Sequence, residues 1–149
     1  MKALVVYFST DGKTAAIAKE VAEKLSADLF EICPQDPYSS ADIKWTNPLA
    51  RCNREKLGNK DVPVVGKIEN FEEYDTIILG FPLWYGGAPN VVTTFCKGYD
   101  WTGKKVCAFA TSLASGIGKT AEKLTPFVKG AASVGAKRIT SAEEVLKDF

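Results

Sequence analysis

The feature that most constrains the fold is an alternation of short apolar runs with segments of helical periodicity. Residues 3–8, 74–81 and 105–110 are almost continuously apolar, which is the pattern of strands buried on both faces of a parallel sheet. A shorter strand is predicted at residues 28–33, and residues 136–139 have the pattern of the tail of a fifth strand.

Segments with apolar residues at helical spacing lie between these strands. Helices are predicted at residues 14–25, 89–99, 119–128 and 141–148, and within residues 49–57. Ser141 and Glu144 have the spacing of a capping box at the start of the last helix. Because parallel neighbours need crossover connections, the alternation predicts an α/β fold, a doubly wound three-layer sandwich with a five-stranded parallel sheet.

Length and composition predict a single domain over residues 1–149, since a chain that is 46% hydrophobic and 25% charged can bury one sizeable core. The 19 basic and 18 acidic residues are interleaved, so no nucleic-acid partner is expected. The apolar start of the chain is too short for a signal segment, and no apolar run approaches the ~18 residues of a membrane span. We therefore expect a cytoplasmic protein without a membrane partner.

The cysteines and the lack of histidine exclude several kinds of chemistry. Cys33, Cys52, Cys96 and Cys107 form no CxxC pair, and the chain has no histidine, so no metal site is predicted. The cysteines are expected to be thiols in a reducing compartment. Ser-His and Cys-His nucleophile pairs are absent, and no residue is predicted to be catalytic.

The loop at residues 9–14 follows the first predicted strand and leads into the first helix. It offers hydroxyl groups, a glycine and a lysine at a helix N-terminus, which is a favourable place for a phosphate. Its predicted ligand contacts are Ser9, Thr10, Gly12, Lys13 and Thr14. It matches neither the dinucleotide GxGxxG motif nor the P-loop. The alternative is a plain strand-to-helix turn with Thr14 as the N-cap.

The loop at residues 82–89 follows the buried strand at 74–81 and places two adjacent aromatic residues beside glycines. Such a pair in a Pro/Gly loop is suited to stacking on a flat ring. Its predicted ligand contacts are Pro82, Leu83, Trp84, Tyr85 and Gly86. The alternative is a hydrophobic plug over the end of the sheet.

The loop at residues 111–118 follows the fourth predicted strand and is rich in small residues, so its N–H groups could bond the edge of a heterocycle. Its predicted ligand contacts are Thr111, Ser112, Leu113, Ser115, Gly116 and Gly118. The alternative is a simple connector. Because ligands of doubly wound sheets bind beyond the carboxyl ends of the strands, the three loops together predict a mononucleotide site.

Three segments resemble the flavodoxin superfamily, most closely bacterial flavodoxin-like domains with a P-[IL]-W-[WY]-G loop. They are VVYFSTDGKT at residues 5–14, YDTIILGFPLWYG at 74–86 and the loop at 111–118. The resemblance spans essentially the whole chain. It implies the strand order 2-1-3-4-5, with FMN bound without a covalent bond between the first and third strands.

The resemblance also implies roles for the loops. The first loop would hold the FMN phosphate, Trp84 or Tyr85 would stack on the ring, and residues 111–118 would contact the other edge of the ring. The chain departs from many relatives at Asp11, where they have threonine. A carboxylate beside a phosphate is repulsive unless it points away or Lys13 offsets it.

These features predict an FMN-binding protein in electron transfer or flavin-dependent reduction, acting with a redox partner or a small-molecule acceptor. The near-neutral net charge of +1 weakens steering toward a basic partner and favours a reductase-like role over a dedicated carrier. One alternative, motivated by Asp11, is an interaction or regulatory module that has lost FMN. A receiver-like phosphate-handling enzyme is disfavoured because the acidic cluster it needs is missing.

Overall fold

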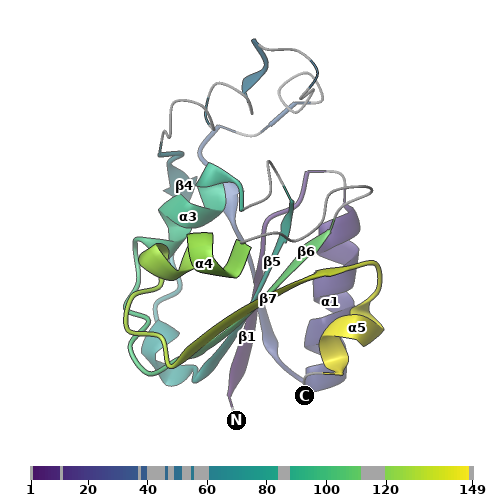
Figure 1. Ribbon diagram of the computed structural model, residues 1–149, viewed down its shortest axis with the longest axis vertical. Helices are drawn as coiled ribbons and strands as arrows, with labels where there is room; N and C mark the ends of the chain where they lie inside the picture. The colour runs from purple at the N-terminus through teal and green to yellow at the C-terminus, as the bar shows by residue number, and fades with distance from the viewer. Residues whose placement is uncertain are drawn as a thin grey trace.

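The computed structural model confirms the predicted α/β architecture and strand order (Figure 1). It describes residues 2–10, 12–36, 38–39, 46, 49–51, 55, 61–83, 88–111 and 120–147. The strands of the main sheet are β1 (Ala3–Tyr7), β2 (Asp28–Glu31), β5 (Thr76–Pro82), β6 (Lys105–Thr111) and β7 (Ser133–Ile139). They lie parallel in the order β2-β1-β5-β6-β7. Counted along this sheet alone, that order is 2-1-3-4-5.

Helices cover both faces of the sheet and complete three layers (Figure 1). The helices α1 (Lys13–Leu25) and α5 (Ala142–Leu146) contact each other and pack on one face. The helices α3 (Asn90–Cys96) and α4 (Thr120–Leu124) lie on the other face. The 3-10 turn η2 (Thr125–Phe127) follows α4 directly, where a proline that cannot donate a backbone hydrogen bond interrupts the helix predicted at 119–128.

The side chains of β1 alternate between the two cores. Leu4 and Val6 belong to the cluster under α3 and α4, and Val5 and Tyr7 belong to the cluster under α1 and α5. All five residues of β1 are buried, as expected of a strand with a neighbour on each side and a helix layer on each face.

The strand predicted at residues 28–33 is divided in two, which is a correction to the sequence prediction. β2 ends at Glu31, and β3 (Cys33–Pro34) pairs antiparallel with β4 (Val64–Val65) in a separate two-stranded sheet. The hydrogen bond from Gln35 N to Pro63 O, at 2.8 Å, extends this pairing. Two-residue strands carry no periodicity from which they could be predicted.

The predicted capping box of α5 is also wrong. Ser141 is the N-cap residue, but its side chain makes no capping hydrogen bond. Glu144 Oε1 instead accepts hydrogen bonds from Thr140 N at 3.3 Å and Thr140 Oγ1 at 2.8 Å. In a capping box the Glu144 carboxylate would accept a hydrogen bond from the backbone N–H of the N-cap residue, Ser141. Here its donors belong to Thr140, the residue before the N-cap.

The helix predicted within residues 49–57 lies mostly outside the described residues. Arg51 and Glu55 are both in helical conformation. Their side chains form an ion pair with 2.8 Å between Nε and Oε2, at the i, i+4 spacing that faces residues toward each other on a helix.

Candidate functional site

The first loop turns sharply from β1 into α1 at Gly12. This residue is the N-cap of α1 and has a φ of 86°, in the left-handed region that favours glycine. Gly12 N donates a hydrogen bond to Ser9 Oγ at 3.1 Å. A side chain on Gly12 would meet no atom within 4 Å, so the backbone conformation, and not crowding, is what requires glycine here.

The N-terminus of α1 presents hydrogen-bond donors and a positive dipole end at this loop. The first intrahelical hydrogen bond runs from Ala16 N to Gly12 O at 3.0 Å, so the N–H groups of residues 13–15 precede the bonded ladder. Within the described residues, no side chain caps α1 and its first turn contains no acidic residue. This end of the helix therefore favours an anion.

The side chains of the first loop fit a phosphate. Ser9 and Thr10 are half-buried, and Gly12 and Lys13 are exposed. The two hydroxyl groups and the ammonium group are hydrogen-bond donors suited to phosphate oxygens, and the glycine allows a close approach to the backbone. Asp11, the departure noted in the sequence, lies outside the described residues.

Thr14 differs from the other predicted phosphate contacts. It is the second residue of α1, and its side chain is 0% exposed. Its Oγ1 lies 2.8 Å from Oγ1 of Thr111, at hydrogen-bond distance. The alternative in which Thr14 caps the helix is wrong, because the N-cap is Gly12.

Thr111 brings the three predicted loops together at the carboxyl ends of the strands. It is the last residue of β6 and lies opposite Pro82 of β5. Its carbonyl oxygen accepts a hydrogen bond from Leu83 N at 2.9 Å, while its hydroxyl contacts Thr14. One residue of the third loop thus contacts both other loops.

The first residue of the second loop still belongs to the sheet. Pro82, which the sequence analysis placed after the strand, is the last residue of β5 and is half-buried. The side chain of Leu83 is part of the core under α3. The remaining predicted ligand contacts lie outside the described residues, and they are Trp84, Tyr85, Gly86, Ser112, Leu113, Ser115, Gly116 and Gly118.

The structure adds a polar cluster at the same end of the sheet that the sequence analysis missed. Glu31 accepts hydrogen bonds from Tyr7 Oη at 3.1 Å and from Cys33 Sγ at 3.4 Å. Burial, and secondarily Glu31, raises the pKa of Tyr7 to about 12, and the same causes raise the pKa of Cys33. Both side chains are therefore protonated at neutral pH. The cluster could have been predicted only from the strand register, which places Tyr7 of β1 beside Glu31 of β2.

A separate hollow of about 380 Å³ lies beyond the end of α3. Its lining residues are Cys96, Lys97, Tyr99, Asp100, Trp101, Pro126, Phe127 and Lys129. It shares no residue with the three strand-end loops, so it is not the site predicted by the sequence. In the part of the chain that the structure describes, no helix is long and apolar enough to cross a membrane.

Fold and site together define a doubly wound α/β protein in which the loop at the carboxyl end of the first strand leads into a helix N-terminus that favours an anion. The family model described as Flavodoxin matches residues 2–148, and the chain belongs to this family. No match was found among curated proteins.

Solved structures are similar over nearly the whole chain. A candidate flavoprotein from Bacteroides eggerthii is 32% identical, with a TM-score of 0.90 over 98% of this chain and 94% of that one. Another from Bacteroides uniformis is 35% identical, with a TM-score of 0.86 over 98% and 96%. A flavoprotein from Lactobacillus acidophilus, solved in complex with FMN, is 22% identical, with a TM-score of 0.73 over 98% and 97%.

Proposed function

We propose that this protein binds FMN without a covalent bond at the carboxyl ends of β1, β5 and β6. The observation that carries the proposal is the start of α1, a helix end without an acidic first turn that follows a loop containing Ser9, Thr10 and Gly12 and begins at Lys13. Membership of the Flavodoxin family and the FMN complex of the Lactobacillus acidophilus flavoprotein support the choice of ligand.

In this proposal the chain's own residues bind and orient the cofactor. The first loop neutralises the phosphate through backbone N–H groups, the hydroxyls of Ser9 and Thr10, and the Lys13 ammonium. Trp84 or Tyr85 provides a flat surface for the ring, and residues 112–118 supply hydrogen bonds to its edge. FMN, when bound, supplies the redox chemistry of the protein.

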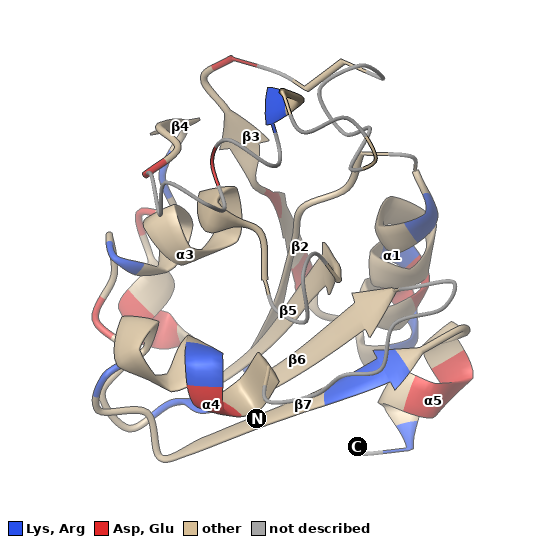
Figure 2. Ribbon diagram, turned by 45° about the horizontal axis from the view of Figure 1, so that its top comes forward, with Lys and Arg blue, Asp and Glu red and all other residues tan. Residues whose placement is uncertain are grey.

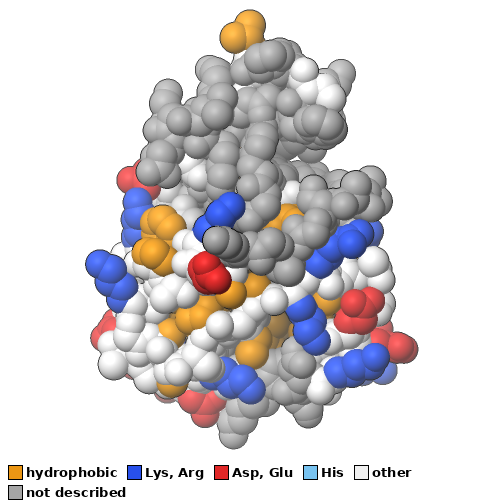
Figure 3. Space-filling view, viewed as in Figure 1, with side chains coloured by type: hydrophobic (Ala, Val, Ile, Leu, Met, Phe, Trp, Pro, Cys, Tyr) orange, Lys and Arg blue, Asp and Glu red, His pale blue; other side chains and the backbone are white. Residues whose placement is uncertain are grey.

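We propose a role in electron transfer or flavin-dependent reduction, with a redox partner protein or a small-molecule acceptor. Basic and acidic residues are interspersed along the described chain (Figure 2), and side chains of both signs lie on the face shown in Figure 3. A mixed surface steers a charged protein partner weakly, which favours reduction of a small molecule. The described cysteines, Cys33, Cys96 and Cys107, are thiols. Thiols persist in reducing compartments, which supports a cytoplasmic location.

The phosphate end of the site is tested with two matched lysine variants of α1. Lys13 is the first residue of the helix, whereas Lys19 is an exposed lysine further along it. Lys13→Gln should weaken FMN binding, and more so at low ionic strength, because an ammonium group near a phosphate is lost. Lys19→Gln should leave FMN binding unchanged. Equal FMN affinities in the two variants would contradict the placement of the phosphate.

A further inference from the structure

A polar cluster outside the three loops holds together the described part of the segment between β3 and β4. Glu55 accepts hydrogen bonds from Tyr38 Oη and, at 2.8 Å, from Arg51 Nε. Arg51 also donates to the carbonyl oxygen of Asp36 at 2.7 Å, and its guanidinium carbon lies 4.0 Å from the centre of the Tyr38 ring. Tyr38, Arg51 and Glu55 thus form one connected group, the Glu55 cluster.

The Glu55 cluster contacts the chain on two sides of the proposed flavin site. The Tyr38 ring packs edge-on against the ring of Phe8, with 5.6 Å between their centres. Phe8 directly follows β1 and precedes the first loop. On the other side, Asn90 Nδ2 donates a hydrogen bond to the carbonyl oxygen of Glu55 at 2.8 Å. Asn90 is the first residue of α3, at the exit of the second loop.

The burial of these groups makes the connection stiff. The side chains of Arg51 and Glu55 are each 14% exposed, and charges so far out of water are stable only while their partners stay in place. Asn90 is 8% exposed, so loss of its bond to Glu55 would take an acceptor from a nearly buried amide group. The exit of the second loop is therefore tied to the end of β1 through the Glu55 cluster.

We infer that Asn90 and the Glu55 cluster are positioning residues, which fix the exit of the second loop relative to β1 and so set the place of the aromatic ring that stacks on the flavin. The inference rests on the proposed function, because that function assigns the second loop to the flavin ring. FMN and riboflavin carry the same ring, so loss of this connection should weaken the binding of both by the same factor.

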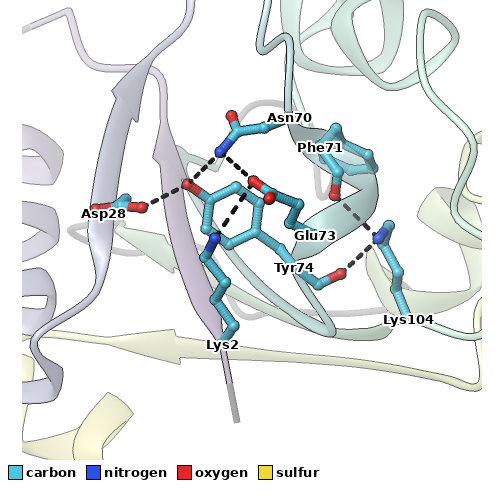
Figure 4. Close-up of polar contacts among 7 residues, drawn as sticks. All are labelled: Lys2, Asp28, Asn70, Phe71, Glu73, Tyr74 and Lys104. Carbon is cyan, nitrogen blue, oxygen red and sulfur yellow. Dashed lines mark hydrogen bonds and ion pairs between the residues drawn. The ribbon is translucent and has the colours of Figure 1, made fainter.

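Amide hydrogen exchange in the ligand-free protein gives the first test. Val92 N donates to the carbonyl oxygen of Pro89 at 2.9 Å and reports on the start of α3. Asn90→Leu removes the amide donor and should speed exchange at Val92 about two- to tenfold. Asn70→Leu is the matched control, because Asn70 makes a side-chain hydrogen bond of the same length, 2.8 Å, to Glu73 at the amino end of the sheet (Figure 4). It should leave exchange at Val92 unchanged.

The second test compares the dissociation constants of FMN and riboflavin in the same variants. Asn90→Leu should raise both constants by one common factor, about three- to tenfold, whereas Asn70→Leu should leave both unchanged. A loss of affinity confined to FMN would place the effect at the phosphate and overturn the inference. Equal losses in Asn90→Leu and Asn70→Leu would reduce Asn90 to a general role in stability. Weaker binding without faster exchange at Val92 would indicate direct contact with the ligand, and either result would overturn the inference.

Tyr38→Phe is a milder second variant, because it keeps the ring that packs on Phe8 and removes only the donor to Glu55. It should weaken both flavins in the same direction, and its combination with Asn90→Leu should cost less than the product of the two single effects. Effects that multiply would show that Tyr38 and Asn90 act separately and would overturn the inference. If the wild type binds neither flavin, the proposed function fails, and amide exchange alone supports or overturns the connection.

Discussion

Gly80 of β5 lies directly opposite Phe109 of β6, and a Cβ atom on Gly80 would fall 2.3 Å from the Phe109 ring. The ring is 1% exposed and belongs to the core under α1. Because it is packed on all sides, it cannot move aside at low cost. The absence of a side chain at Gly80 is what admits the ring at the centre of the sheet.

Gly80→Ala should therefore lower the free energy of unfolding by about 1–3 kcal/mol, the usual cost of overpacking. Gly135 on β7 is the control, because an added Cβ there would meet nothing within 4 Å. Gly135→Ala should change the stability by less than about 0.5 kcal/mol. Denaturant unfolding of both variants checks this, and an equally stable Gly80→Ala would contradict the packing.

Lys104 is a buried lysine that holds the segment before β5 at the amino end of the sheet (Figure 4). Its Nζ donates to the carbonyl oxygen of Phe71, at 3.1 Å, and to that of Tyr74, and it lies 4.8 Å from the centre of the Phe71 ring. Phe71 begins the 3-10 turn η1 (Phe71–Glu73). Lys104 thus bonds the carbonyl oxygens at both ends of this turn.

Lys104→Met should lower the free energy of unfolding by about 1–3 kcal/mol, because two carbonyl groups lose a charged donor. Lys2→Met is the comparison within the same cluster. Lys2 pairs with Glu73 at 3.4 Å, and both side chains are at least half exposed, so its loss should have little effect. Thermal unfolding of the two variants checks this difference. Similar melting temperatures would contradict the larger structural role of Lys104.

The raised pKa of Tyr7 predicts an alkaline loss of stability. Burial first, and Glu31 second, raises the folded-state pKa from 10.0 to about 12. Below pH 10 the phenol is protonated in both states, and its contribution is fully present. As the pH rises from 10 to 12, the unfolded state releases the proton first, so stability falls.

In Tyr7→Phe the free energy of unfolding should fall less steeply between pH 10 and 12, because a difference of about one bound proton between the folded and unfolded states is removed. Glu31→Gln should lower the pKa of Tyr7 only in part, because burial is the larger cause. Unfolding measured across this pH range, together with phenolate absorbance, checks both variants. A full return of the Tyr7 pKa to its ordinary value in Glu31→Gln would contradict the order of the two causes.

A substitution at Asp11 should strengthen FMN binding instead of weakening it, because a carboxylate in the proposed phosphate-binding loop repels the ligand's charge. Asp11→Thr should tighten FMN binding and leave riboflavin binding unchanged. The ratio of the two dissociation constants in wild type and variant measures the effect. An equal or weaker FMN affinity would show that the carboxylate points away or contributes favourably.

The sequence was most informative where structure depends on neighbours along the chain. Each residue of β1 is buried by sheet neighbours and helices, and its continuous apolar run predicts this state directly. The strand-to-helix turn at residues 9–14 was predicted as well, but its N-cap was not, because the sequence analysis considered Thr14 for this position and the left-handed conformation lies at Gly12.

The rest depends on distant residues. The loop sequence predicts Thr14 as a ligand contact, and only the packing of α1 against β6 shows that its hydroxyl also lies within hydrogen-bond distance of Thr111. The pairing of β3 with β4 joins segments about thirty residues apart, through strands of two residues each. The capping box failed because Thr140 offers Glu144 a competing hydroxyl. Such pairings arise from tertiary structure, which overrides local pattern.

A flavin site with a phosphate-specific end is tested by a fluorescence titration of the wild-type protein with FMN, riboflavin and FAD. We expect saturable quenching of FMN fluorescence and a clearly weaker response to riboflavin, because only FMN carries the terminal phosphate that the start of α1 would bind. Equal affinities for FMN and riboflavin would contradict the phosphate site. Failure to bind any of the three would contradict the flavin site as a whole and favour an interaction module that has lost its cofactor.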